Sequence, residues 1–154
     1  MITTEWKNVY FHSHVNIKNI IGKELINDDN VAVMELVKNS YDAGAKTVHV
    51  EFRNLKNENI NNELFIVDDG NGMSKEDILQ KWLNLAYSIK RVQNTQNNRL
   101  QAGNKGIGRF SCDRLGKNLD IYTKKDQKIY HLKINWEDFE NHEDYSVEIN
   151  QIPM

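Results

Sequence analysis

The sequence predicts an α+β domain of two layers, in which helices cover one face of a mixed, mostly antiparallel sheet. Segments with a helical repeat of hydrophobic residues stand beside paired segments that alternate and are joined by short polar turns. At 154 residues and 39% hydrophobic content, the chain suits one compact domain with a sizeable core.

The first predicted helix runs from about Asn30 to Ala43. Asp29 or Asn30 is the expected N-cap, and Gly44 stands where a left-handed residue ends a helix. The hydrophobic residues of this segment are expected to face the core: Val33, Leu36, Val37 and Tyr41.

Two strand pairs are predicted. The alternating "KTVHVEFRN" and the more continuously apolar "ELFIVDDG" are expected to form a hairpin in the centre of the sheet. The second pair is "NLDIYTKK" and "KIYHLKINW", joined at "KDQ", and one last strand is expected at Tyr145 to Ile149.

Two further helices are predicted. Ser74, with Asp77 three residues later, resembles a capping box and opens a helix through about Lys90. The segment "IGRFSCDRLG" forms a short helix that ends at Gly116. Between these helices, residues 91–106 form a polar loop, and a loop of this length is usually functional or disordered.

Composition excludes several classes of protein. A formal net charge of −2 gives no global basic field for nucleic-acid binding. Cys112, the single cysteine, has no internal disulfide partner, so a reducing compartment fits best. The N-terminus lacks a signal-peptide pattern and no apolar run reaches membrane length. We therefore expect a soluble cytoplasmic domain with no membrane partner.

The first polar motif lies on the first predicted helix. Glu35, Asn39 and Asp42 fall on one side of it, within roughly 60° at about 100° per residue. A carboxylate, an amide and a second carboxylate beside an apolar stripe form either a solvated face or the polar wall of a site.

The second motif is "DDGNGM", residues 68–73, at the end of an apolar strand. Taken alone, it favours a tight turn, because Asp and Gly dominate turns. In the functional interpretation, one aspartate accepts a hydrogen bond from a planar donor such as an exocyclic amine, and the glycines let a flat ring approach the backbone.

The third motif is "GNKGIG", residues 103–108, which precedes a helix. Glycines there expose backbone N–H groups at a helix N-terminus, where the dipole favours an anion. No acidic residue occurs from Ile78 to Cys112, as a loop facing a polyphosphate requires. A flexible basic loop is the alternative.

Other phosphate and metal motifs are missing from the sequence. It contains no GxxxxGK[ST] motif, and its glycines do not stand in a first strand–helix turn as in a Rossmann fold. His12 and His14 are interpreted as structural or surface residues, because no Cys and His cluster accompanies them.

In this order, the three motifs resemble those of the GHKL ATPases, which include DNA gyrase B, the heat-shock chaperone ATPases, histidine kinases and MutL. "ELVKNSYDAGA" resembles the N-box, "DDGNGM" the DxGxG adenine motif and "GNKGIGRF" the glycine-rich lid motif. Within the superfamily, the sequence looks closest to MutL and to MORC-type ATPases with their bacterial relatives. The resemblance implies a Bergerat-type ATP-binding fold.

The resemblance also implies roles for the helix residues. Glu35 is the expected general base that activates the attacking water. Asn39 is the expected Mg²⁺ ligand, through its amide oxygen. Asp42 is expected to order the ATP site by hydrogen bonding.

The adenine motif receives its roles in the same way. Asp68 is expected to accept a hydrogen bond from the adenine amine. Gly70 and Gly72 are expected to approach the cofactor through backbone, and Met73 to pack on the base.

The resemblance also assigns the residues expected to bind the phosphates, which lie in the lid motif and in the helix before it. Asn84 matches a position that approaches ribose and phosphate. Gly106, Ile107 and Gly108 are expected to bring backbone N–H groups to the phosphates, and Lys105 to neutralise their charge.

Two features of the family pattern are missing. The family has a later strand with a Gly-Thr motif whose threonine helps to bind adenine, and no such pair follows Gly116. Thr123, in the preceding strand, is the remaining candidate for this role. A transducer domain, which supplies a lysine to the γ-phosphate in MutL-like proteins, is also missing. Residues 1–154 are therefore expected to be one N-terminal ATP-binding domain, a fragment of a longer protein.

The resemblance implies an ATP-binding and Mg²⁺-dependent ATP-hydrolysing module. Closure of its lid would drive conformational change or homodimerisation of the full-length protein. Nucleic acid stays open as a partner of missing domains. The alternatives are a histidine kinase-like phosphotransfer domain and a non-catalytic nucleotide sensor. The sequence does not choose among DNA repair, chromatin-like compaction, phage defence and chaperone work.

Overall fold

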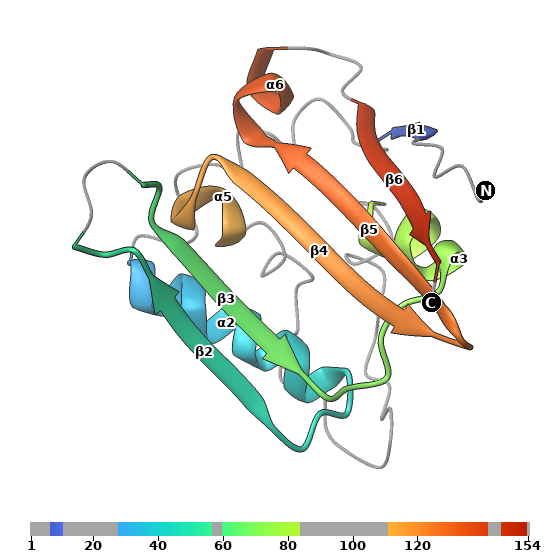
Figure 1. Cartoon of the computed structure of the whole chain (residues 1–154), viewed down its shortest axis with the longest axis horizontal. Helices are drawn as coiled ribbons and strands as arrows, with labels where there is room; N and C mark the ends of the chain where they lie inside the picture. Colours follow the sequence, from blue (N-terminus) through green and yellow to red (C-terminus); the bar gives the residue numbers. More distant parts are fainter. Residues whose placement is uncertain (1–6, 11–27, 57–59, 84–110, 142–145, 154) are drawn as a thin grey trace.

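The structure is a computed structural model, and it describes residues 7–10, 28–56, 60–83, 111–141 and 146–153. Within these ranges the chain forms a layer of strands with helices behind it (Figure 1). None of the helices in these ranges is both long and apolar enough to cross a membrane. The arrangement confirms a mixed α+β fold.

The larger sheet has four strands in the order β1-β6-β5-β4, and every pairing in it is antiparallel. Its strands are β1 (Lys7–Tyr10), β4 (Asn118–Lys125), β5 (Lys128–Asn135) and β6 (Ser146–Ile152). β1 pairs with β6, so the first and the last described strands lie side by side (Figure 1). The predicted mostly antiparallel sheet is therefore confirmed.

The hairpin of β2 (Val48–Arg53) and β3 (Glu63–Asp68) forms as predicted, but its predicted place in the sheet centre is wrong. In the described residues it is a separate antiparallel sheet of two strands. The segment after β3 contacts β4 through a hydrogen bond in which the Met73 backbone N–H donates to the Thr123 hydroxyl oxygen. This contact takes the place of a backbone ladder between β3 and β4.

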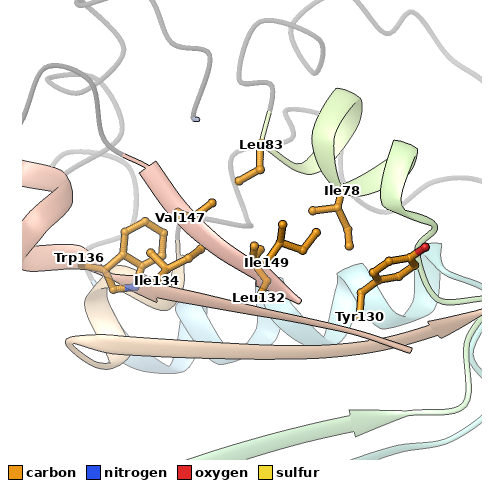
Figure 2. Packing of buried hydrophobic residues seen from close by; sticks show 8 residues of the cluster. All are labelled: Ile78, Leu83, Tyr130, Leu132, Ile134, Trp136, Val147 and Ile149. Carbon is orange, nitrogen blue, oxygen red and sulfur yellow. The ribbon is translucent and has the colours of Figure 1, made fainter. Parts of the chain in front are cut away.

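The core lies between the larger sheet and the helical segment that begins at Ser74 (Figure 2). Alternate residues of β5 and β6 point to this side of the sheet, as the two-residue period of a strand requires. Full burial of a large apolar side chain contributes about 1.5–3 kcal/mol, so this cluster is the main hydrophobic contribution to stability in the described residues. Its members are Ile78, Leu83, Tyr130, Leu132, Ile134, Trp136, Val147 and Ile149.

Helix α2 (Asp29–Asp42) lies behind β2 and β3 (Figure 1). Its N-cap is Asp28 instead of the predicted Asp29 or Asn30, because the extended Asp28 accepts a hydrogen bond from the Asn30 backbone at 2.7 Å. Gly44 follows the helix with a φ of 82°, as predicted. The buried face is centred on Ala32 and Ser40, whereas Tyr41, predicted to face the core, is 42% exposed.

The second predicted helix begins where expected. Ser74 and Asp77 form the capping box, with both reciprocal hydrogen bonds at 3.1 Å. After one turn, α3 (Lys75–Asp77) continues as the π-helix η1 (Ile78–Trp82), in which the Leu83 N–H donates to the Ile78 carbonyl at 2.8 Å. The predicted end of this helix near Lys90 lies outside the described residues.

Two short elements were not predicted, β1 and α6 (Trp136–Asn141). The predicted short helix before Gly116 is α5 (Ser111–Leu115). Cys112 on this helix packs against the core, and burial raises the pKa of its thiol to about 12. This environment makes Cys112 a poor nucleophile at neutral pH.

Asp77 also joins the start of α3 to the hairpin of β4 and β5. Its carboxylate, 15% exposed, accepts hydrogen bonds from Lys125 Nζ at 2.7 Å, from Lys81 Nζ and from the Ser74 backbone. Burial works to raise the pKa of Asp77, but the hydrogen bonds from Lys125, Lys81 and Ser74 outweigh it and hold the pKa well below its usual range. The charged form is therefore the one that the folded chain favours.

The variant Asp77→Asn is expected to lose about 1–3 kcal/mol of unfolding free energy at pH 7, as for other hydrogen bonds to charged groups. Because the folded pKa lies below the unfolded value of about 3.9, this stabilisation is complete above about pH 5 and is lost as the pH falls below 4. Urea unfolding at pH 7 and at pH 3 checks this. The difference between the wild-type chain and the variant should shrink at pH 3.

The matched control is Glu137→Gln, which breaks an exposed ion pair with Lys117. The side chain of Lys117 is 77% exposed and that of Glu137 is 59% exposed. Exposed pairs contribute little to stability, so unfolding should hardly change at either pH. A pH-independent loss in Asp77→Asn would show that the carboxylate charge is not what stabilises this corner of the fold.

Candidate functional site

Asp68 ends β3 and is fixed on both of its carboxylate oxygens. The Ser40 hydroxyl of α2 donates to Oδ2 at 2.8 Å, and the Gly70 backbone N–H donates to Oδ1 at 2.8 Å. The Asp68 residue remains exposed even so. The structure thus links the predicted adenine-binding aspartate directly to the helix that carries Glu35 and Asn39.

Asp69 has a different, structural role. Its Oδ1 accepts hydrogen bonds from the backbone N–H groups of Lys46 and Thr47 at 2.7 and 2.9 Å. The hydrogen bonds from Thr47 and Lys46 lower the pKa of Asp69. Asp69 therefore holds the segment between α2 and β2, which leaves Asp68 as the aspartate of this pair that can face a ligand.

Gly70 and Asn71 lie against the end of α2. The Asn71 N–H donates to the Ala43 carbonyl at 2.9 Å. A Cβ on Gly70 would stand 2.8 Å from Asp68 Oδ1 and 3.0 Å from the Ala43 Cβ, so a larger residue would push on the aspartate. The crowded neighbours of Gly70 are atoms of the protein itself, so the predicted approach of this glycine to the cofactor stays a prediction.

Gly72 and Met73 lie against β4. The Met73 N–H donates to Thr123 Oγ1 at 2.7 Å, and Gly72 has a φ of 62° with Lys124 backbone beside it. Thr123 is 9% exposed, and its cross-strand partner Tyr130 belongs to the core. Since cross-strand partners share a face, Thr123 points to the side of the sheet that carries the helices.

The three polar residues of the first motif all lie on α2. Glu35 is 24% exposed in its side chain and pairs with Lys38 Nζ at 2.6 Å, one turn along. Asn39 is exposed, and Asp42 is half-buried in the last turn. Because Ser40 follows Asn39 directly, the hydrogen bond from Ser40 to Asp68 brings this part of α2 to the adenine motif.

The predicted phosphate-binding residues are not described by the structure. Asn84, Lys105, Gly106, Ile107 and Gly108 all fall within residues 84–110, outside the described ranges. The described part of the predicted site is therefore the part expected to bind the base: the last turns of α2, residues 68–73 and Thr123.

Two open hollows are found on the described surface. One, of about 620 Å³, touches the site only at Asn71 and is otherwise lined by Lys124, Lys125, Asp126 and Gln127 at the β4–β5 turn. The other, of about 230 Å³, lies between α5 and α6. Neither hollow contains Glu35 or Asp68 in its lining, so a common cavity for the three motifs stays a prediction.

The described residues contain no group of three or more His, Cys, Asp or Glu side chains placed to hold a metal ion. Asn39 offers one amide oxygen on α2, one turn after the predicted base Glu35. This sparse donor set fits Mg²⁺, which keeps several waters and is bound through one or two protein oxygens together with substrate phosphates. It does not fit an ion that needs a full set of protein ligands.

Ser40 was not predicted as a site residue. The sequence feature that could have identified Ser40 is its spacing along the helix. It follows Leu36 by four residues and Ala32 by eight, which places it on the buried side. A buried polar side chain needs a hydrogen-bond partner, and here the partner is Asp68. Asp69 was recognised only as part of the motif.

The sequence profile of one protein family, described as "Histidine kinase-, DNA gyrase B-, and HSP90-like ATPase", matches residues 27–154. The match begins just before α2 and includes all the described site residues.

Three relatives are similar over parts of the chain. The TNF receptor-associated protein 1 homolog, mitochondrial, of Dictyostelium discoideum is 27% identical over 127 residues, which cover 70% of this chain and 18% of that protein. ATPase morc-1 of Caenorhabditis elegans is 34% identical over 105 residues, which cover 68% of this chain and 11% of the relative. DNA mismatch repair protein MutL of Dictyoglomus turgidum is 45% identical over 60 residues, which cover 39% of this chain and 10% of that protein. The aligned regions thus span only 10% to 18% of the lengths of these relatives.

Proposed function

Because the chain belongs to the family of histidine kinase-, DNA gyrase B- and HSP90-like ATPases, the GHKL ATPases, we propose that it binds ATP and hydrolyses it with Mg²⁺. Family membership implies the Bergerat fold and ATP as the ligand. The observation that supports this site best is the hydrogen bond between Ser40 and Asp68, since it joins the catalytic helix to the adenine motif.

Asp68, Met73 and Thr123 form the base-binding part of the proposed site. Asp68 accepts the hydrogen bond of the adenine amine, and Met73 packs on the ring. The Thr123 hydroxyl already accepts the Met73 N–H, so its own proton is free to be donated toward the base or a bridging water. Gly72 allows this approach because it has no side chain between residues 71–73 and β4.

Glu35 and Asn39 carry the proposed chemistry. The Glu35 carboxylate takes a proton from the attacking water, whose oxygen bonds to the γ-phosphorus while the bond from that phosphorus to the ADP oxygen breaks, which releases ADP and phosphate. For this, Glu35 must exchange its ion pair with Lys38 for the water. The pair spans three residues on a partly exposed helix face, and such pairs contribute so little that the exchange is easy.

Asn39 would hold Mg²⁺ through its amide oxygen, with the phosphates and water completing the shell. When bound, the ion neutralises phosphate charge that develops during transfer. Asp42 orders the end of α2 on the same side of the helix. Asn84 and residues 105–108 complete the site at the ribose and phosphates in this proposal.

In this proposal, the lid segment closes over bound ATP. This closure drives a change of conformation or homodimerisation in a longer protein. The relatives support this view of the chain as one ATP-binding domain, since each is several times longer than the aligned part. Contacts with nucleic acid, if the full protein makes them, are assigned to other domains.

The 154-residue chain is expected to melt at a higher temperature with ATP and Mg²⁺ present. A ligand at about 100 times its Kd adds about 2.7 kcal/mol to the unfolding free energy. For a chain of this length, that gain raises the Tm by about 5–10 °C. Differential scanning fluorimetry over a series of ATP concentrations measures it.

The control variant is Asp68→Asn, which puts an amide donor beside the adenine amine and should remove most of the rise in Tm. A wild-type chain whose Tm does not move at millimolar ATP and Mg²⁺ would contradict ATP binding. An equal rise in the wild-type chain and in Asp68→Asn would contradict the assignment of Asp68.

A further inference from the structure

The buried hydroxyl of Ser40 has a single proton, and the structure indicates where it goes. Ser40 is 4% exposed, and its Oγ lies 2.8 Å from Asp68 Oδ2 but 3.5 Å from the Leu36 carbonyl oxygen. The shorter distance is typical of an O–H···O hydrogen bond, whereas the longer one is at the limit. The carboxylate is also the stronger acceptor, so the proton belongs to Asp68.

This assignment fixes what the site can offer to a ligand. Each Asp68 oxygen already accepts one protein donor, from Ser40 or from Gly70, which sets the plane of the carboxylate. A carboxylate has about four acceptor positions, so free lone pairs remain on both oxygens. The Ser40 oxygen, with its proton committed, also has only lone pairs left. The Ser40–Asp68 pair can therefore accept hydrogen bonds from a ligand but cannot donate them.

We propose, on the basis of the ATP-binding function above, that Ser40 is a positioning residue that makes the site selective for purines with an exocyclic amine. Without the Ser40 hydroxyl, the Asp68 side chain keeps only the Gly70 N–H to fix it and can rotate. A purine with a carbonyl at the same position would bring an acceptor against the acceptors of Asp68, which costs an unpaired polar group. Ser40 acts through Asp68 and needs no contact with the nucleotide.

The test compares two nucleotides on two proteins. ATP and purine riboside triphosphate, which lacks the amine, are titrated by calorimetry into the wild-type chain and into Ser40→Ala. The wild-type chain should prefer ATP by at least about tenfold, the usual scale of one charge-assisted hydrogen bond. In Ser40→Ala this preference should fall by about three- to tenfold, with the affinity for purine riboside triphosphate nearly unchanged.

Three further variants separate positioning from simple stability. Ser40→Cys, a weaker donor of similar size, should give an intermediate preference, and Ser40→Thr, which keeps the hydroxyl, should restore it. Ser111→Ala removes another buried serine, 1% exposed, that is not a partner of Asp68. It should lower the Tm without any change in nucleotide preference.

The possible failures are distinct. If Ser40→Ala weakens both nucleotides equally, or keeps the full preference for ATP, Ser40 does not position Asp68 and the inference is overturned. If the wild-type chain binds neither nucleotide, or binds both equally, the proposed recognition of adenine by Asp68 is wrong, and the role of Ser40 is overturned with it.

Discussion

The variant Glu35→Ala is expected to lose about 10²- to 10⁴-fold in ATP turnover, the usual contribution of a general base, and to keep ATP binding. Glu35 lies on α2 one turn before Asn39, in the part of the helix that Ser40 holds to Asp68. Alanine favours the helix, and the lost ion pair with Lys38 is partly exposed, so the fold should tolerate the change. Phosphate release under saturating ATP and Mg²⁺ measures turnover, and the rise in Tm with ATP measures binding.

Glu51→Ala is the matched control for charge. It removes an exposed glutamate of β2 that pairs with Arg53 and lies opposite Phe65, away from the Asp68 end of the hairpin, and it should leave turnover unchanged. Turnover that survives in Glu35→Ala would exclude Glu35 as the base. A wild-type chain that binds ATP and releases no phosphate would favour the nucleotide sensor over the ATPase.

The second large effect is expected for Gly72→Ala, on stability. Gly72 has a φ of 62°, which costs about 1–2 kcal/mol for a residue with a side chain. A Cβ there would also lie 2.1 Å from the Lys124 carbonyl oxygen and 3.2 Å from Thr123 Oγ1. Because these are atoms of β4, the clash separates residues 71–73 from the strand. A loss of about 3 kcal/mol or more is expected, which lowers the Tm by about 6–12 °C.

Gly116→Ala provides the comparison. Gly116 has no positive φ, and the nearest atom to an added Cβ is the Asn118 carbonyl oxygen at 3.8 Å, so little change in Tm is expected. Thermal unfolding of both variants by circular dichroism decides the matter. If Gly72→Ala is as stable as Gly116→Ala, then the close contact between residues 71–73 and β4 is not present in solution.

Local signals in the sequence predicted the secondary structure that carries the site. The helix from about residue 30, the strand before Asp68 and the capping box at Ser74 all depend on neighbours in the chain, and all three are present. The N-cap was placed too late in the chain because Asp28, Asp29 and Asn30 are all good caps, and only the backbone conformation chooses among them.

Long-range contacts were harder to predict. The bond from Met73 to Thr123 joins residues 50 apart, and that from Ser40 to Asp68 joins residues 28 apart. The hydrophobic periodicity of the sequence cannot predict either of these two hydrogen bonds. The order of the motifs allowed their roles to be assigned by resemblance, but only the structure reveals Ser40 as the connection between α2 and β3.

Tyr41 and β1 were misjudged for a related reason. Tyr41 was expected in the core as part of the hydrophobic pattern of the helix, yet the buried residues of α2 are the small Ala32 and Ser40. β1 has only four residues, too few for a clear alternation, and its strand conformation depends on β6 at the other end of the chain.

That pairing has a consequence for how the domain is made on the ribosome. Lys7 pairs with Ile149, so β1 leaves the exit tunnel long before its partner strand has been translated. At about 5–20 residues per second, the N-terminal strand waits on the order of 10 s. During this time the β1 backbone has no strand to pair with, because its neighbour in the described sheet is β6. The sheet can therefore be completed only once Ile149 has been translated, so its first strand depends on a strand made much later.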